Sequence, residues 1–264
     1  MSEILSVEGI FVNFGGVMAV GNVSASFAEK SITAIIGPNG AGKTTLINAI
    51  SGAFPPTKGE VIFKGSDITG LPQHKVAELG IARTFQNLRL FRHMSTLENV
   101  MVARHLKTSS GFLSCSLKLP RSRRDERAIR SSAEEYLEFV GLSDRAGEDA
   151  LSMPFGLQRH LEIARALALE PEVILLDEPA GGLNTQETEA LAQLIHRIRD
   201  KGITVLLIEH DMSLVMNISD RIMVLNYGQK IADGAPDEIQ RDEAVIEAYL
   251  GRADSDEPAQ SQQG

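Results

Sequence analysis

A glycine-rich loop near the start of the chain decides the fold. The loop is Gly37-Pro38-Asn39-Gly40-Ala41-Gly42-Lys43-Thr44, and it fits the pattern G-x-x-x-x-G-K-[ST]. The apolar run Ile32–Ile36 precedes it, and residues 43–51 have a helical pattern, so the loop joins a strand to a helix. Glycines let backbone N–H groups curl around phosphate oxygens, and a helix N-terminus adds positive potential. Chance produces this pattern in only about one per cent of such chains, so the loop predicts a nucleotide-phosphate site.

Each residue of this loop has an expected role. We expect Lys43 to reach the β- and γ-phosphates of the nucleotide and Thr44 to ligate Mg²⁺. Thr45 is expected to add a phosphate contact. The other residues expected to line the nucleotide are Gly37, Pro38, Asn39, Gly40, Ala41 and Gly42.

Two later apolar runs end in polar side chains that suit the same chemistry. Val173–Leu176 is followed by Asp177 and Glu178, and Ile203–Ile208 is followed by Glu209 and then His210. Ligands bind at the carboxyl ends of strands in parallel sheets. We therefore expect Asp177 to hold Mg²⁺ through water and Glu178 to polarise the water that attacks the γ-phosphate. His210 is expected to contact the γ-phosphate and to orient Glu178.

The order of patterns along the chain predicts an α/β fold. Short strand-like runs fill residues 4–36, helical spacing replaces them from about Leu88 to Arg165, and strands alternate with helices after Pro171. Such alternation favours a parallel sheet covered on both faces. The segment from Leu88 to Arg165 is predicted to be a helical insertion into that core, with a helix over residues 128–140.

Composition excludes several classes of protein. The chain has 264 residues, which suggests one or two domains, and a net charge of −9, which argues against a general nucleic-acid binder. The one cysteine, Cys115, can form no intramolecular disulfide. The N-terminus lacks the features of a secretory signal, and no apolar run approaches the roughly 20 residues that span a bilayer. If the protein acts at a membrane, we expect it to be peripheral.

Two segments stand apart from this pattern. Lys118–Arg130 is rich in Lys and Arg, which is typical either of a solvated helix face or of a contact to a partner or to lipid headgroups. Residues 252–264 contain no large apolar side chain, and we expect a disordered tail there.

Together these motifs resemble the ATP-binding subunits of ABC transporters, over residues 4 to about 250. Phe14 matches the aromatic residue that stacks on adenine in that family, although Phe11 and a core role for Phe14 are alternatives. Gln86 matches a glutamine that senses Mg²⁺ and the attacking water. The resemblance implies a P-loop NTPase core, a small antiparallel β subdomain and an inserted helical subdomain. It places one ABC ATPase domain at residues 1–251, with the core at about 1–87 and 166–251 and the helices at about 88–165.

The family's signature motif, Leu-Ser-Gly-Gly-Gln, is altered in this chain, which has Leu151-Ser152-Met153-Pro154-Phe155-Gly156. Counting back from Leu161–Arg165 puts Gly156 on the second signature glycine and Pro154 on the serine. Starting from Leu151 instead requires two extra residues. We prefer the first alignment because proline suits the start of a helix. The resemblance then implies that Gly156 faces the nucleotide of the opposite subunit, without the serine hydroxyl. Asn184 also replaces an aspartate that many members have.

Within the family, the closest similarity is to the LivG-type ATPases of branched-chain amino acid importers. It lies in Gly80–Asn87, in the Pro-aromatic-Gly signature and in Ala244–Gly251. This implies ATP and Mg²⁺ as cofactors and two transmembrane permease subunits as partners. It also implies a second ATPase subunit, either a copy of this chain or a related one, and an extracytoplasmic binding protein that acts indirectly. The location would be the cytoplasmic face of the inner membrane.

Other functions stay open at this stage. Importers of urea and short amides look much alike, so the substrate rests on the resemblance. A soluble ABC ATPase acting on ribosomes or DNA is disfavoured by the single phosphate loop and the lack of heptads. A nucleotide-binding subunit with weak turnover is suggested by Pro154. Leu88, Leu90 and Phe91 are either an apolar docking surface for the membrane subunits or part of the core.

Overall fold

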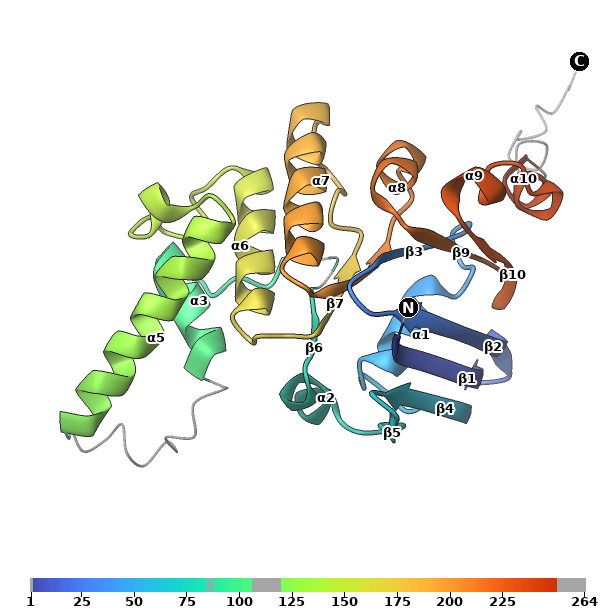
Figure 1. Cartoon of the computed structure of the whole chain (residues 1–264), viewed down its shortest axis with the longest axis horizontal. Coiled ribbons are helices and arrows are strands. Elements are labelled where there is room, and N and C mark those ends of the chain that lie inside the picture. Colours follow the sequence, from blue (N-terminus) through green and yellow to red (C-terminus); the bar gives the residue numbers. More distant parts are fainter. Residues whose placement is uncertain (1, 85, 87, 106–119, 251–264) are drawn as a thin grey trace, which may run out of the picture.

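The structure is a computed structural model that describes residues 2–84, 86, 88–105 and 120–250. The predictions for Cys115, for much of the basic segment 118–130 and for the tail 252–264 lie outside the described residues and side chains. Figure 1 shows an α/β body with a helical part at one end and a smaller sheet beside it. Among the described residues, no helix has the length and apolar character needed to cross a membrane.

A six-stranded sheet forms the centre of the molecule. Its strand order is β10-β9-β3-β8-β7-β6, and every neighbouring pair is parallel except β10 with β9. The strands are β3 (Ile32–Ile36), β6 (Ile81–Arg83), β7 (Val173–Asp177), β8 (Thr204–Ile208), β9 (Arg221–Asn226) and β10 (Gln229–Gly234). This confirms the predicted parallel sheet, including strand β3 at the predicted bounds.

The central strands are apolar throughout because both faces of the sheet are covered. Every residue of β3, β7 and β8 is buried. Alternate side chains point to opposite faces: Ile174 and Leu176 join the core under α6 and α7, whereas Val173 and Leu175 join the core under α1. The helices concerned are α1 (Lys43–Ile50), α6 (Phe155–Leu167) and α7 (Thr185–Asp200).

A second, antiparallel sheet with strand order β2-β1-β4-β5 packs against the α1 side. Its strands are β1 (Glu3–Phe14), β2 (Val17–Ala28), β4 (Lys58–Phe63) and β5 (Ser66–Asp67). The sequence has two short apolar runs here, Ile4–Val7 and Ile10–Phe14, which predict two strands, whereas β1 is one long strand. The reason is an irregular register between Val7 and Ile10 at Gly9, whose φ of 56° lets the strand bend without ending.

The helical part consists of α3 (Thr96–His105), α5 (Pro120–Phe139), the short 3₁₀ helix Ser143–Arg145 and α6. The described part of this region contains an isolated bridge, Ser95 to Asp149, but no named strand, as the sequence predicts. The other helices among the described residues are α2 (Gln73–Leu79), α8 (Met212–Ile218), α9 (Pro236–Ile239) and α10 (Glu243–Leu250). Figure 1 shows α3 and α5 grouped on the far side of α6 from the sheet.

Replacing a core side chain of β8 tests the role of this strand. Leu206 is fully buried, so we expect Leu206→Ala to lower the free energy of unfolding by about 2–5 kcal/mol. Urea denaturation measures the change. Val17→Ala, at an exposed position of β2, is the control and should cost little. A loss below about 1 kcal/mol for Leu206→Ala would contradict the central position of β8.

Candidate functional site

The glycines of the phosphate loop are required by its path. Gly37 has φ of 146°, and a Cβ there would lie 2.0 Å from the carbonyl oxygen of Leu225. Gly42, the N-cap of α1, has φ of 98°, and a Cβ there would lie 2.5 Å from the carbonyl oxygen of Ala19. Larger residues would therefore displace the loop from β9 and β2. The loop is held against both sheets by backbone that leaves no space for a side chain.

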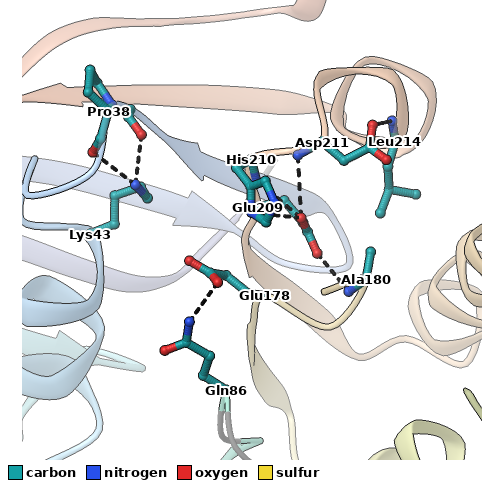
Figure 2. A network of polar contacts seen from close by, with 10 residues as sticks. Pro38, Lys43, Gln86, Glu178, Ala180, Glu209, His210, Asp211 and Leu214 are labelled. Carbon is teal, nitrogen blue, oxygen red and sulfur yellow. Dashed lines mark hydrogen bonds and ion pairs between the residues drawn. The ribbon is translucent and has the colours of Figure 1, made fainter. Parts of the chain in front are cut away.

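Lys43 places a buried ammonium group at this loop. Its Nζ donates to the carbonyl oxygens of Gly37, at 2.7 Å, and Pro38, at 3.1 Å (Figure 2). Thr44 follows on the first turn of α1 and is exposed, and Thr45 is half-buried. The loop thus combines a positive charge, a helix N-terminus and a hydroxyl group, as phosphate binding requires.

Asp177 ends β7 in a buried ion pair. Its Oδ2 lies 2.8 Å from Nη2 of Arg83 on the neighbouring strand β6. Arg83 also donates through Nη1 to Oδ1 of Asn48, at 2.5 Å, and to Oγ of Ser51, at 3.1 Å. Asn48 lies on α1 and Ser51 is its C-cap, so Arg83 connects the helix after the phosphate loop to this carboxylate.

The second oxygen of Asp177 fits a Mg²⁺ site. Oδ1 is buried and has no hydrogen-bond partner among the residues that the structure describes. Buried polar atoms are almost always paired, so an acceptor of this kind is suited to a cation or its water shell. No group of three or more His, Cys, Asp or Glu side chains in the described parts of the chain could hold a metal alone. A cation here would need oxygen ligands from the nucleotide and from hydroxyl or amide groups.

Glu178 follows Asp177 in a strained conformation. Its φ is 48°, in the left-handed region that non-glycine residues rarely adopt, and its N–H donates to the carbonyl oxygen of Ile208 at 2.9 Å. Strain of this kind costs about 1–3 kcal/mol and is concentrated at functional sites. Nε2 of Gln86 donates to Oε2 of Glu178 at 2.8 Å (Figure 2). The structure thus brings together two residues that lie 92 positions apart.

His210 lies near this pair, but its ring does not hold Glu178. The side chain is 64% exposed, and its Nδ1 lies 3.9 Å from Oε2 of Glu209. Among the described residues, the hydrogen-bond partner of the Glu178 side chain is Gln86. In this structure Gln86 donates to Glu178, while His210 faces solvent just after β8.

Arg159 on α6 anchors the segment that carries Gln86. Its Nη2 donates to the carbonyl oxygen of Gln86 at 2.8 Å, and its Nη1 lies 3.3 Å from Oε2 of Glu162. Both charged side chains are buried. Through this hydrogen bond, α6 of the helical part holds the backbone of Gln86 in place.

Phe14 is not a core residue. It is 51% exposed and makes an edge-to-face contact with Phe54, with ring centroids 5.4 Å apart. Phe11 is half-buried. An exposed ring at the end of β1 is available to stack on a base.

The signature segment begins a helix where the preferred alignment predicts it. Pro154 is the N-cap of α6, and Gly156 lies in the first turn, where a Cβ would be 2.7 Å from Oε1 of Glu187. The Oγ of Ser152, by contrast, donates to the carbonyl oxygen of Asp149 within its own loop, at 2.7 Å. These positions favour the alignment that places Gly156 on the second glycine. Glu187 itself forms a capping box with Asn184 at the start of α7.

Sequence reasoning missed three charged residues around the site: Arg83, Arg159 and Glu209. Arg83 ends β6, Arg159 lies on α6 and Glu209 directly follows β8, and each of the three charged side chains is buried. Buried ions are expensive unless paired, so a charged residue within or at the end of an apolar strand is a signal that a partner exists. The sequence does not show which partner.

Comparison with known proteins identifies the family. The family model "ABC transporter" matches residues 20–181, and the model "Branched-chain amino acid ATP-binding cassette transporter" matches residues 229–255. The chain belongs to the ATP-binding cassette family of ABC transporters. It is an ATPase of that family, with a nucleotide-binding domain for ATP.

Relatives match nearly the whole chain. The chain is 47% identical over 251 residues to the high-affinity branched-chain amino acid transport ATP-binding protein BraF of Pseudomonas aeruginosa, covering 95% of this chain and 98% of BraF. It is 45% identical, with the same coverage, to the corresponding protein LivG of Escherichia coli. A solved ATP-binding cassette in its ADP conformation is 33% identical with a TM-score of 0.83, covering 95% of this chain and 100% of that one.

Removal of Arg83 tests the buried ion pair. Arg83→Met leaves the carboxylate of Asp177 uncompensated, so we expect a loss of about 3–5 kcal/mol in the free energy of unfolding, measured by urea denaturation. The control is Lys64→Met, which breaks the exposed pair with Glu172 and should cost about 0–1 kcal/mol. Equal losses of unfolding free energy in both variants would show that the buried pair of Arg83 and Asp177 matters no more for stability than an exposed pair.

Proposed function

We propose that this chain is the ATP-hydrolysing subunit that energises an ABC importer of branched-chain or other hydrophobic amino acids. The observation that carries the proposal is the hydrogen bond between Gln86 and Glu178 beside an intact phosphate loop, in a chain similar to BraF and LivG over 95% of its length. An importer of urea or short amides is the alternative within the family. A soluble, non-transport role is disfavoured because the relatives are transport proteins over almost their whole length.

The residues of the site would act on ATP in defined ways. The backbone of residues 37–42, with Lys43 and Thr45, would hold the phosphates, and Phe14 would stack on adenine. Glu178 would polarise the attacking water, with its carboxylate oriented by Gln86. His210 would turn from solvent to contact the γ-phosphate.

Mg²⁺ would be held by Thr44, Gln86 and Asp177, whose buried Oδ1 is a suitable acceptor, and it would supply positive charge to the phosphate oxygens of the nucleotide. Arg83 pairs with Oδ2 of Asp177, and Oδ1 is a buried acceptor with no hydrogen-bond partner among the described residues. The chain's own groups fix the carboxylate before any ligand arrives.

The active form would be a dimer of cassettes attached to membrane subunits. A solved cassette that is 26% identical to this chain, with a TM-score of 0.75, is described as a dimer. In such a dimer Gly156 would face the nucleotide of the opposite subunit. The second cassette would be a copy of this chain or a related one, and two permease subunits would bind at the cytoplasmic face of the inner membrane. A substrate-binding protein would act through the permeases.

The helical region would carry the contact to the permeases. We propose a division into a core, at about 1–87 and 166–251, and a helical subdomain, at about 88–165. Of the apolar residues after Gln86, Leu90 packs against the core, whereas Phe91 is 40% exposed with its ring centroid 4.8 Å from the Arg165 guanidinium. Arg165 also donates to the carbonyl oxygen of Arg89. Phe91 is therefore the candidate docking residue.

Removal of the proposed base tests hydrolysis. Glu178→Gln keeps the size of the side chain, but the glutamine amide cannot act as a base. We therefore expect kcat to fall about 10²- to 10⁴-fold while ATP binding persists. Phosphate release measures kcat, and a fluorescent ATP analogue measures nucleotide binding. Glu134→Gln, on the exposed side of α5, is the control. Turnover unchanged in Glu178→Gln would exclude this residue as the base.

A charge at the candidate docking residue tests coupling. Phe91→Asp should abolish substrate uptake in cells or proteoliposomes while ATP binding is unchanged, because a charged aspartate cannot be buried in an apolar contact with the permeases. Leu79→Asp is the matched control, since Leu79 is 46% exposed on α2. Wild-type uptake with Phe91→Asp would remove Phe91 from the docking surface.

Affinity capture from gently solubilised native membranes tests the whole proposal. We expect two polytopic membrane proteins and a second cassette to co-purify with this chain. Amino acid uptake by the recovered assembly would then identify the substrate. Recovery of ribosomal or DNA-repair proteins instead would overturn the proposed transport function.

A further inference from the structure

Glu209 is a buried carboxylate for which the proposed hydrolysis gives no role. It directly follows β8, and its side chain is 0% exposed. Burial is the largest influence on its pKa and raises it, while backbone N–H donors lower it. A charge in this position needs partners, and Figure 2 shows them on two sides of the carboxylate.

Each oxygen of Glu209 serves a different segment. Oε1 accepts from the N–H of Ala180 at 2.8 Å. Oε2 accepts from the N–H of His210 at 3.1 Å, with the N–H of Asp211 at 3.5 Å and the ring Nδ1 of His210 at 3.9 Å. One carboxylate therefore connects two loops that follow two neighbouring strands, β7 and β8.

The first of these loops leads from Glu178 to the start of α7, beside the Phe155–Gly156 segment that is proposed to face the partner subunit. The N–H of Gly181 donates to the carbonyl oxygen of Glu178 at 3.2 Å, and the N–H of Leu183 donates to that of Ala180 at 3.0 Å. Two tight turns thus carry the chain from Glu178 to Asn184, the N-cap of α7. A Cβ at Gly182 would lie 3.2 Å from the ring of Phe155, at the start of α6, so the loop passes close to that ring.

The second loop carries the residue expected at the γ-phosphate. His210 is followed by Asp211, the N-cap of α8, whose Oδ1 accepts from the N–H of Leu214 at 3.1 Å. The backbone of His210 is thus held on one side by α8 and on the other by Glu209. Its ring, by contrast, is 64% exposed.

We infer that Glu209 is a positioning residue that ties His210 to the segment from Ala180 to Asn184, so that the γ-phosphate contact and the partner-facing loop move together. This rests on the proposed function. A movement of either loop would strain or break a buried, charge-assisted hydrogen bond, which stabilises more than a neutral one. Closure of the dimer at one loop would then be transmitted to His210 through Glu209.

Glutamine is a poor substitute because both oxygens of Glu209 accept hydrogen bonds. An amide has one acceptor oxygen, so its NH₂ group would face backbone N–H donors on one side. Aspartate keeps the charge but is shorter by one methylene group. It can reach the N–H of His210, the next residue in the chain, or the N–H of Ala180, but not both with good geometry.

Kinetics of Glu209→Gln and Glu209→Asp in the full chain test the inference. We expect kcat for ATP to fall about 10- to 100-fold in both, as for other residues that orient a functional histidine, with KM changed less than about twofold. In a His210→Ala background, Glu209→Gln should cause almost no further loss, because the two residues act together. Glu189→Gln, at an exposed position of α7, is the matched control and should be like wild type.

Amide exchange tests the same link without turnover. We expect the N–H of Ala180 to exchange at least about tenfold faster in both Glu209 variants than in wild type. Unchanged protection at Ala180, or losses in kcat that add to those of His210→Ala, would overturn the inference. Absence of hydrolysis in the wild type, with Glu178→Gln no different, would contradict the proposed function instead, and the exchange result would still decide on Glu209.

Discussion

The parallel pairing of β3, β8 and β7 is the constraint on which the site depends. The three strands are buried along their whole length, so their register cannot shift without exposing an apolar face. In that register Asp177 pairs with Ile208. The carboxyl ends of the strands therefore bring the phosphate loop, Glu178 and His210 to one edge of the sheet. Chemistry that is spread over more than 170 positions of the sequence is gathered there by hydrophobic burial alone.

Buried charges then fix what the sheet has gathered. Arg83 holds Asp177, Arg159 holds the backbone of Gln86, and Glu209 holds the loops after β7 and β8. Each is a group that is costly to remove from water, and each is compensated by specific partners. Such pairs add little to stability compared with an apolar core, but they allow few alternative arrangements. The site is thus positioned by electrostatics within a frame set by packing.

The sequence predicts the frame better than the site. Continuous apolar runs such as Val173–Leu176 predict strands β3, β7 and β8, because a strand buried on both faces is apolar at every position. The glycine spacing before Lys43 predicts the phosphate site, because that spacing is characteristic of loops that bind phosphate through backbone N–H groups. The partner of Glu178 is a different matter. The sequence favours His210, whereas the structure has Gln86, since only the fold determines which of two distant side chains comes within 2.8 Å. For the same reason, the roles of Arg83 and Glu209 are not visible in the sequence.

The left-handed backbone of Glu178 has a consequence for how this protein can change over time. At φ of 48°, glycine or asparagine would have a lower conformational energy than glutamate. Substitutions that relieve the strain would make the chain more robust to heat and to further mutation, yet each would remove the side chain on which turnover is proposed to depend. Selection for folding and selection for activity therefore act in opposite directions at this one position. A catalytically silent descendant of this chain would be expected to lose its glutamate here early and to gain stability by the change.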